Sequence, residues 1–244
     1  MSQLYSTLAE IYHEMYQHVF DYDKEFHFYD TLLKRNNSHK ILEIGCGSGM
    51  LASLFMDNGY DYLGLDLSSE MLDIARREVK SDRFIQCDMR NLSFNQQFDA
   101  ILISGRSIAY VTDNQGIIDT LSGIHKSLMD SGLLIFGVFN ANEIFENFND
   151  FEQNIEHNGK KIRRISHLEK NLLTGWTYDW SAKYTIEQDN EISEYDDITT
   201  LRAFTRDEIA LFIKLTGFCI EEITEEGKAF TIIAKKNRNT QRVH

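Results

Sequence analysis

The sequence has no proline, only three cysteines and no long apolar run among its 244 residues. The cysteines are far apart and odd in number, so they form neither a disulfide framework nor a C-x-x-C metal pair. No apolar stretch approaches the roughly 20 residues that a membrane-spanning helix needs. The first residues also lack the basic start and apolar core of a signal peptide, so we expect a cytoplasmic protein with no membrane partner.

Basic residues are in the minority as well. The chain has 25 Lys and Arg against 38 Asp and Glu, a formal net charge of −13. A nucleic-acid partner requires a basic face, so we expect none. His13 and His18 come close to an H-E-x-x-H zinc motif, but they are one residue too far apart and Gln17 stands in the second ligand position. We therefore expect no metal.

The stretch with the clearest chemical meaning is KILEIGCGSGM, residues 40–50. A short apolar run typical of a buried strand leads into Gly45, Gly47 and Gly49, and a helical pattern follows. Glycines let the backbone turn and let a ligand approach closely, while the helix start offers free N–H groups to its polar part. A dinucleotide fingerprint would need a small residue where Met50 stands, so the pattern argues against an NAD site.

This glycine corner resembles the first motif of class I S-adenosylmethionine (SAM) methyltransferases. Three further stretches match that family in order, YLGLDLSSEM at 62–71, FIQCDM at 84–89 and FDAILISGRSIAY at 98–110. The resemblance implies that Asp66 accepts hydrogen bonds from the ribose hydroxyls and Asp88 from the adenine amino group, although Asp66 is also placed to cap a helix. It implies SAM as cofactor, S-adenosylhomocysteine as product, and a cofactor site of Glu43, Gly45, Cys46, Gly47, Gly49, Asp66, Leu67, Met71, Cys87, Asp88, Met89 and Ser104.

Alternating strand and helix patterns predict an α/β fold, a Rossmann-like seven-stranded, mostly parallel sheet with helices on both faces. We assign this SAM-binding domain to 38–140 plus 203–236, with a charged tail at 237–244. The expected strands lie near 41–45, 62–66, 83–87, 98–103, 132–140, 219–224 and 229–235, and the expected helices near 49–58, 69–80, 114–130 and 204–217.

Two further segments flank or interrupt this domain. Residues 1–37 predict an N-terminal cap of two helices, whose tyrosines either pack on the domain or form a lid over the ligands. Residues 141–202 predict a small antiparallel insert after the fifth strand, a short helix or irregular connector followed by strands near 160–170, 174–186 and 194–203. Trp176 shares one strand face with Tyr178 and Trp180, and this face either seats the insert or forms a wall of the acceptor site.

The order of features as a whole resembles the dTDP-amino-sugar N,N-dimethyltransferases and, more broadly, glycine-type N-methyltransferases. The matching pieces include IYHEMY near the start and DDITTLRAFTRDEI after the insert. The resemblance implies a small-molecule acceptor, with an amine nitrogen favoured, and catalysis mainly through alignment of the reacting atoms. Transfer to oxygen or carbon on the same scaffold and non-catalytic SAM binding are the alternatives. We expect a monomer or a homodimer.

The candidate catalytic and acceptor-binding residues come from three parts of the chain. Tyr12, Tyr16 and Tyr110 are the candidates for positioning the reactants. The candidates for substrate binding are Arg106, Ser107, Asn140, Trp176 and Arg202. If the acceptor carries a diphosphate, Arg163, Arg164, Lys183 or Arg202 can bind it through their cationic groups, and all four are equally consistent with surface charge.

Overall fold

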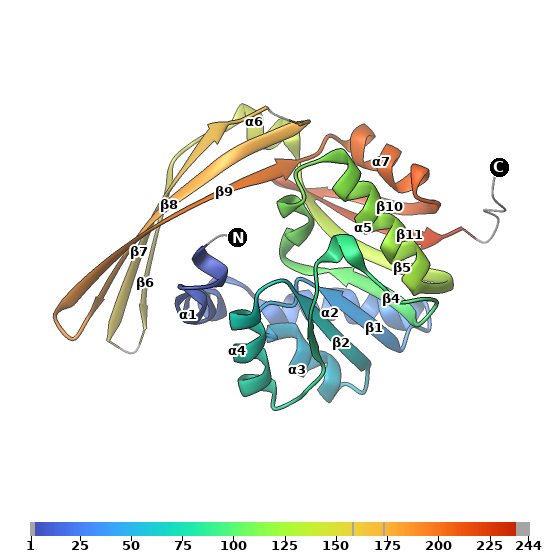
Figure 1. Cartoon of the computed structure of the whole chain (residues 1–244), viewed down its shortest axis with the longest axis horizontal. Helices are drawn as coiled ribbons and strands as arrows, with labels where there is room; N and C mark the ends of the chain where they lie inside the picture. Colours follow the sequence, from blue (N-terminus) through green and yellow to red (C-terminus); the bar gives the residue numbers. More distant parts are fainter. Residues whose placement is uncertain (1–2, 158, 173, 238–244) are drawn as a thin grey trace.

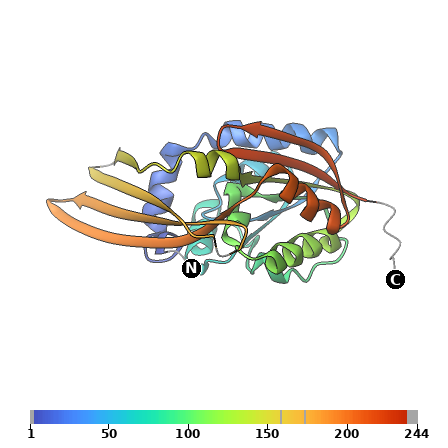
Figure 2. The same cartoon turned by 90° about the horizontal axis from the view of Figure 1, so that it is seen from above.

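Two β-sheets organise the chain, and the computed structural model describes residues 3–157, 159–172 and 174–237. The larger sheet is flanked by helices, and the smaller curved sheet projects from one side of it (Figures 1 and 2). Within these described residues, no helix is long and apolar enough to cross a membrane. Apart from Asn237, the predicted tail lies outside the described residues.

The larger sheet confirms the predicted seven-stranded, mostly parallel α/β fold. Its strands are β1 (Lys40–Ile44), β2 (Asp61–Asp66), β3 (Phe84–Gln86), β4 (Phe98–Ile103), β5 (Leu128–Phe139), β10 (Phe218–Glu226) and β11 (Ala229–Lys236). They lie in the order β10-β11-β5-β4-β1-β2-β3, and only β11 runs antiparallel to its neighbours. The central strands are apolar on both faces because both faces are covered, and β4 is buried along nearly its whole length.

Five helices cover this sheet. Three pack on one face, α2 (Tyr22–Arg35), α3 (Met50–Asp57) and α4 (Ser69–Val79), and two on the other, α5 (Asn114–Ser127) and α7 (Arg206–Leu215). Neighbouring residues of β4 show the two faces. Leu102 belongs to the core with Phe26 and Phe55, whereas Ile101 belongs to the core with Leu121 and Ile213. The helices that alternate with the strands agree with the predicted pattern.

Strand β5 begins earlier than its sequence predicts. The turn residues Asp130-Ser131-Gly132 lie inside the strand, where Ser131 has a φ of 63° and the pairing with β4 changes register between Phe98 and Ala100. A bulge of this kind accommodates turn-type residues without ending the strand. The predicted start at residue 132 is therefore wrong by four residues, since the strand starts at Leu128.

The insert contains four antiparallel strands where three were predicted. After the short helix α6 (Ala141–Glu146) come β6 (Phe151–His157), β7 (Lys160–Lys170), β8 (Trp176–Gln188) and β9 (Glu191–Ala203), which lie in that order in the sheet. The additional strand is β6. It lies at the edge and its described side chains are exposed or half-buried, so its sequence lacks the clear apolar alternation of β8.

The chain enters and leaves the insert at adjacent points. Asn140 and Phe204 form a parallel bridge, in which Phe204 N donates to Phe139 O at 2.8 Å and Ala141 N donates to Phe204 O at 2.9 Å. Next to this bridge, the fully buried Arg202 pairs with Glu208 at 2.6 Å. The bridge and the ion pair together fix the base of the insert on the larger domain.

Only part of the predicted N-terminal cap lies beside the insert. The short 3₁₀ helix η1 (Gln3–Tyr5) and α1 (Ala9–Val19) bury Leu4, Leu8 and Met15 in the core that lies under the insert sheet. Helix α2, by contrast, packs on the larger sheet. The segment that can act as a cover is therefore η1 and α1.

Candidate active site

The glycine corner lies between the end of β1 and the start of α3. Gly45, Gly47 and Gly49 have φ values of 74°, 52° and 77°, in the left-handed region that favours glycine. The amides of Gly45 and Cys46 donate to Leu65 O at 2.7 and 2.9 Å, which ties the corner to the end of β2. A Cβ on Gly45 would lie 2.1 Å from Ser107 Oγ, so this position has no room for a side chain.

Asp66, the last residue of β2, links the corner to the next strand. Its Oδ2 accepts a hydrogen bond from Gly47 N and its Oδ1 accepts one from Ser68 N, both at 2.9 Å. Burial raises the pKa of Asp66, while these backbone donors act in the opposite direction. The residue that caps α4 is Ser68, whose Oγ accepts from Met71 N at 3.0 Å. The carboxylate of Asp66 is thus held by the glycine loop and is not needed as the helix cap.

A cavity of about 320 Å³, which we call the Asp66 cavity, opens beside this carboxylate. Leu67, Cys87, Asp88 and Met89 from the ends of β2 and β3 also line it. Leu67 is 46% exposed and presents apolar surface to this cavity. Acceptors next to apolar surfaces suit a nucleoside, so these residues fit SAM without any change of the fold.

Asp88 reaches this cavity with a cation beside it. The Arg90 guanidinium donates to its two carboxylate oxygens, at 2.6 Å from Nη2, and lowers the pKa of Asp88. Arg90 also lines the cavity. Asp88 is therefore kept ionised, and a ligand donor must share it with Arg90.

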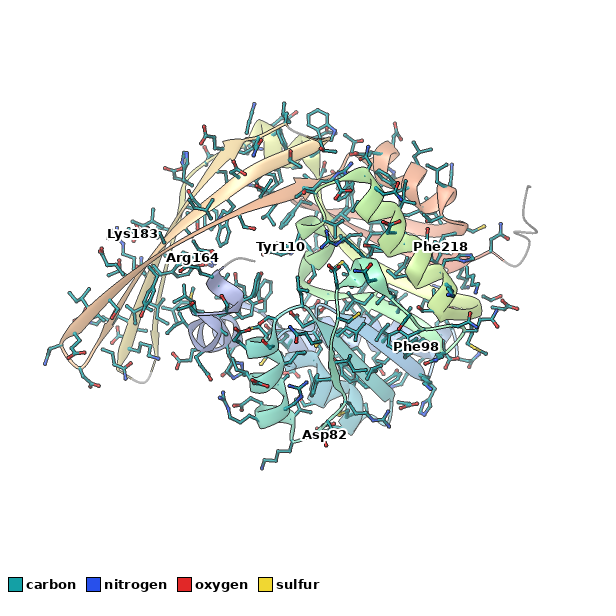
Figure 3. The ribbon with its side chains drawn as sticks, viewed as in Figure 1. Asp82, Phe98, Tyr110, Arg164, Lys183 and Phe218 are labelled. Atoms are coloured by element: carbon teal, nitrogen blue, oxygen red, sulfur yellow. The ribbon has the colours of Figure 1, made fainter. Side chains whose placement is uncertain are left out.

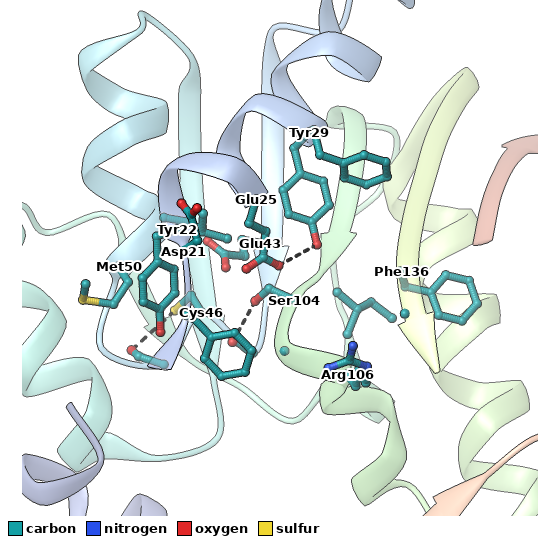
Figure 4. A pocket seen from close by; sticks show the side chains of 18 of the residues that line it. Asp21, Tyr22, Glu25, Tyr29, Glu43, Cys46, Met50, Ser104, Arg106 and Phe136 are labelled. Carbon is teal, nitrogen blue, oxygen red and sulfur yellow. Dashed lines mark hydrogen bonds between the residues drawn. The ribbon is translucent and has the colours of Figure 1, made fainter. Parts of the chain in front are cut away.

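A second cavity of about 450 Å³, the Glu25 cavity, lies on the other side of the glycine corner. Figure 4 shows Glu25, Glu43 and Tyr29 in its wall, with Ser104 and Arg106 from the end of β4 nearby. Burial raises the pKa of Glu25, whose Oε1 accepts from Tyr29 Oη at 3.2 Å. Burial also raises the pKa of Glu43 to about 7. Tyr12, Gly45, Gly47 and Gly105 line both cavities, so the two spaces meet at the glycine corner.

The chain leaves β4 in an unusual turn within the 3₁₀ segment η3 (Ser104–Tyr110). Gly105 and Arg106 both have left-handed conformations, with φ values of 60° and 58°. This conformation is uncommon for a residue with a side chain, and such residues concentrate at functional sites. It places Arg106 in the wall of the Glu25 cavity, with its guanidinium 5.5 Å from the centre of the Phe139 ring.

The segment of η1 and α1 covers the Asp66 cavity. Tyr5 Oη lies 2.6 Å from Tyr110 Oη, and Ser68 Oγ donates to Tyr5 O. Further along, His13 Nδ1 lies 3.0 Å from Ser48 Oγ of the glycine corner. Figure 3 shows Tyr110 between the larger domain and the insert. The cover therefore contacts three of the loops that form the site.

Most of the predicted site residues line one of the two cavities. These are Tyr12, Glu43, Gly45, Cys46, Gly47, Asp66, Leu67, Cys87, Asp88, Met89, Ser104, Arg106, Ser107 and Tyr110. Six others do not. Gly49 caps α3, Met71 is buried behind the corner, and Tyr16 stacks on Tyr12 with ring centres 4.1 Å apart.

The other three lie near the insert. Asn140 caps α6 and donates to Glu225 Oε1 at 2.6 Å, and Trp176 packs on Phe145 with ring centres 5.3 Å apart. The guanidinium of Arg202 is paired with Glu208 at the base of the insert. These three side chains make contacts within the fold and line neither cavity, and the sequence does not reveal which polar side chains the fold itself uses.

Sequence reasoning missed the part of the site that α2 contributes. Tyr22, Glu25 and Tyr29 line the Glu25 cavity, together with Phe136 of β5 and Glu226 of β10. The signal was present, since a glutamate at position 25 lies beside the buried stripe of Phe26, Tyr29 and Leu33. That signal is weak, however, because charged residues ordinarily flank the apolar stripe of an amphipathic helix.

No cluster of three or more His, Cys, Asp or Glu residues in the described part of the chain is arranged to hold a metal ion. The two cavities are lined by carboxylates, hydroxyls, aromatic rings and a few basic side chains, among them Arg106.

Comparisons with known proteins agree with this geometry. Residues 41–132 match the family model described as a methyltransferase domain. A putative methyltransferase of Bacillus subtilis (strain 168), YqeM, is 26% identical, with 91% of this chain and 90% of the relative covered. The dTDP-3-amino-3,6-dideoxy-alpha-D-glucopyranose N,N-dimethyltransferase of Streptomyces fradiae is 23% identical, with 88% and 84% covered.

Solved structures show the same fold over nearly the whole chain. DesVI of Streptomyces venezuelae has a TM-score of 0.85 at 20% identity, covering 93% of this chain and 98% of its own. SAM-bound CalS10 of Micromonospora echinaspora, an amino pentose methyltransferase, has a TM-score of 0.80 at 18% identity, with 93% and 97% covered. The methyltransferase domain matched at residues 41–132, the shared fold and the glycine corner with its acids together support a class I SAM-dependent methyltransferase with the architecture of the small-molecule type.

Proposed function

We propose that the protein transfers a methyl group from SAM to the nitrogen of a small-molecule amine. The observation that carries the proposal is the position of Gly45 and Gly47, which line both cavities. The Asp66 cavity has the acids that a nucleoside requires, and the Glu25 cavity offers space for an acceptor directly next to it. A donor and an acceptor can therefore meet at the glycine corner.

The residues of the Asp66 cavity have separate tasks in this proposal. When bound, SAM supplies a methyl group on a positively charged sulfur, so the protein needs mainly to align the reactants. Asp66 and Asp88 accept hydrogen bonds from the sugar and the base, and Leu67 and Met89 provide apolar surface. Tyr12 borders both cavities and holds the reactants in line.

An amine acceptor is supported by the charge of the site and by the named relatives. Of the charged residues that line the Glu25 cavity, Asp21, Glu25, Glu43 and Glu226 are acids, and only Lys24 and Arg106 are bases. The Streptomyces fradiae relative is named as acting on an amino sugar. An amine attacks through its own lone pair, so it needs no residue to activate it beyond one that removes its proton.

Transfer to oxygen is the second candidate, and one observation favours it. Glu43 is buried in the wall of the acceptor space, and its pKa is raised to about 7. A carboxylate with such a pKa can serve as a base towards a hydroxyl group. The pH dependence of the rate distinguishes the two acceptors, since an amine substrate gives a rate that rises with the deprotonation of the substrate itself.

The first test is calorimetric titration with S-adenosylhomocysteine. We expect Asp66→Ala to weaken binding about 100-fold, because two charge-assisted hydrogen bonds are lost. Asp57→Ala is the matched control, since Asp57 is exposed at the end of α3 and lines neither cavity. Absence of binding by the unmodified protein would overturn the proposal.

A further inference from the structure

The Glu25 cavity differs from a site for phosphorylated ligands in the charge of its walls. Glu25 and Glu43 lie close enough to influence each other, since the charge of Glu25 contributes to the raised pKa of Glu43. Two bases, Lys24 and Arg106, line the same cavity, and Arg106 acts to lower the pKa of Glu25. An anionic ligand would have to enter against two carboxylates, whereas a cation would be attracted.

Aromatic rings form much of the remaining wall. Tyr12, Tyr22 and Phe20 come from the cover and the start of α2, and Tyr29, Phe28 and Phe136 complete the set. Tyr12 stacks on Tyr16, and Tyr16 stacks on Phe20, with ring centres 4.1 and 5.3 Å apart. Rings of this kind attract substituted ammonium groups through their faces, and carboxylates add to that attraction. The lining therefore matches an amine better than a neutral polar ligand.

The four cations that the sequence offered for a diphosphate all have partners within the fold. Arg163 pairs with Glu152 at 2.9 Å, Lys183 with Glu194 at 2.8 Å and Arg202 with Glu208 at 2.6 Å. The fourth, Arg164, lies in the insert (Figure 3). It is buried, donates to Tyr16 Oη at 3.0 Å and to Gln153, and lies over the Trp180 ring. None of these four lines either cavity. The cationic groups of the insert thus maintain the insert and its contact with α1.

We propose that the acceptor is a compact amine without a phosphate group, held at its nitrogen by the carboxylates and aromatic rings of the Glu25 cavity. This inference rests on the proposed function and narrows its substrate class. A carboxylate that binds the ammonium form can also accept its proton, which leaves the lone pair of the nitrogen free to attack. The amino-sugar nucleotides of the named relatives differ from such a substrate in carrying a diphosphate.

The test uses the full chain saturated with S-adenosylhomocysteine and three probes. Choline carries the quaternary nitrogen, 3,3-dimethyl-1-butanol is its uncharged counterpart of the same shape, and thymidine 5′-diphosphate represents a nucleotide. We expect choline to bind at least about tenfold more tightly than the uncharged counterpart, measured by calorimetry. We expect Glu25→Gln to reduce that ratio severalfold, because the variant keeps the shape and the acceptor oxygen for Tyr29 but removes the charge.

Two further variants make the test decisive. Asp23→Asn is the matched control, since Asp23 lies on the same helix but is exposed and outside the cavity, and it should leave the ratio unchanged. Tyr22→Leu removes a ring without changing charge and should weaken choline binding even if Glu25→Gln does not fold.

Three results would overturn the inference. The first is equal binding of choline and its uncharged counterpart, and the second is tighter binding of thymidine 5′-diphosphate than of choline. The third is a preference for choline that both Glu25→Gln and Tyr22→Leu leave intact. Each of them is compatible with S-adenosylhomocysteine binding, so the proposed function would stand. Loss of that binding in the unmodified protein would instead remove the proposed function itself.

Discussion

The two cavities on either side of the glycine corner use carboxylates in opposite ways. In the Asp66 cavity, Asp66 is held by two backbone amides and Asp88 by a guanidinium, so both have fixed donors. In the Glu25 cavity, Glu25 and Glu43 accept from tyrosine hydroxyls and have raised pKa values because they are buried. The first pair is organised to accept hydrogen bonds, and the second pair can bind or release a proton.

This difference shows that a carboxylate's role depends on its donors as well as on its position. Arg90 stabilises the charged form of Asp88 and lowers its pKa, and two backbone amides oppose the effect of burial on Asp66, whose pKa is nevertheless raised. Burial without such donors favours the neutral form, so Glu43 changes state near neutral pH. Substitutions on each side should therefore have distinct effects.

Gly45→Ala should have the largest effect, because Gly45 lines both cavities. The new Cβ would meet Ser107 Oγ at 2.1 Å and would impose a φ of 74° on alanine. We expect the free energy of unfolding to fall by about 3 kcal/mol or more. Gly59→Ala is the control, since its φ is 84° with nothing within 4 Å, and it should cost only about 1 kcal/mol. If urea unfolding shows the same loss of unfolding free energy for both variants, the Ser107 side chain moves away from the new Cβ at little energetic cost.

Glu43→Gln should stabilise the protein in a pH-dependent manner. Burial raises the pKa of Glu43 from 4.5 to about 7 in the folded chain. The unfolded state therefore loses its proton first, and the stability of the unmodified protein falls as the pH rises from about 4.5 to about 7. Above that range we expect a gain of about 3 kcal/mol for the variant, which disappears towards pH 4.5.

Asp66→Asn sharpens the same contrast. Both oxygens of Asp66 accept backbone hydrogen bonds, and an amide can supply only one acceptor oxygen. We expect a loss of about 1–2 kcal/mol at pH 8, opposite in sign to the effect of Glu43→Gln. Thermal unfolding of the two variants at pH 5 and pH 8 tests both statements, and a shared sign at pH 8 would contradict the contrast between the cavities.

Arg106→Gly should affect the Glu25 cavity while changing stability little. Glycine removes the strain of a φ of 58°, but the contact of the guanidinium with the Phe139 ring is lost. These contributions oppose each other, so the free energy of unfolding should change by less than about 1 kcal/mol. Choline should bind a few-fold more tightly, because the cation opposite Glu25 is gone. Weaker choline binding in calorimetry would contradict this assignment.

Tyr5→Phe should have a similarly small effect on stability and should act on the other cavity. It removes the contact between the Tyr5 and Tyr110 hydroxyls, which is worth about 0.5–1.5 kcal/mol. We expect S-adenosylhomocysteine to dissociate a few-fold faster in stopped-flow measurements, with choline binding unchanged. An unchanged dissociation rate would show that the cover opens without breaking this contact.

The sequence predicts the Asp66 cavity better than the Glu25 cavity for a physical reason. Gly45, Asp66 and Asp88 each lie at the end of a strand or within two residues of it, and a parallel sheet brings the ends of its strands together. The Glu25 cavity combines Glu25 of α2, Phe136 of β5 and Glu226 of β10, whose proximity depends on packing across the whole sheet.

What the sequence did not reveal in the insert has a related origin. Strand β6 was missed because an edge strand shows little apolar alternation, and the pairing of Arg202 with Glu208 was not foreseen because Glu208 belongs to the following helix. Strand β8, with one buried and one wet face, was recognisable from the alternation of Tyr178, Trp180 and Tyr184. Local sequence patterns predict helices and strands, whereas the hydrogen-bond and ion-pair partners of polar side chains are known only from the tertiary structure.

The adjacent points at which the chain enters and leaves the insert have a consequence for evolution. Because Asn140 and Phe204 are bridged to each other, the segment between them can be exchanged or lengthened while the order of the seven strands stays the same. Descendants of such a gene can change the insert independently of the machinery that holds the methyl donor. The insert can then be replaced at its base, so that acceptor preference changes while the larger sheet and its cofactor site stay the same.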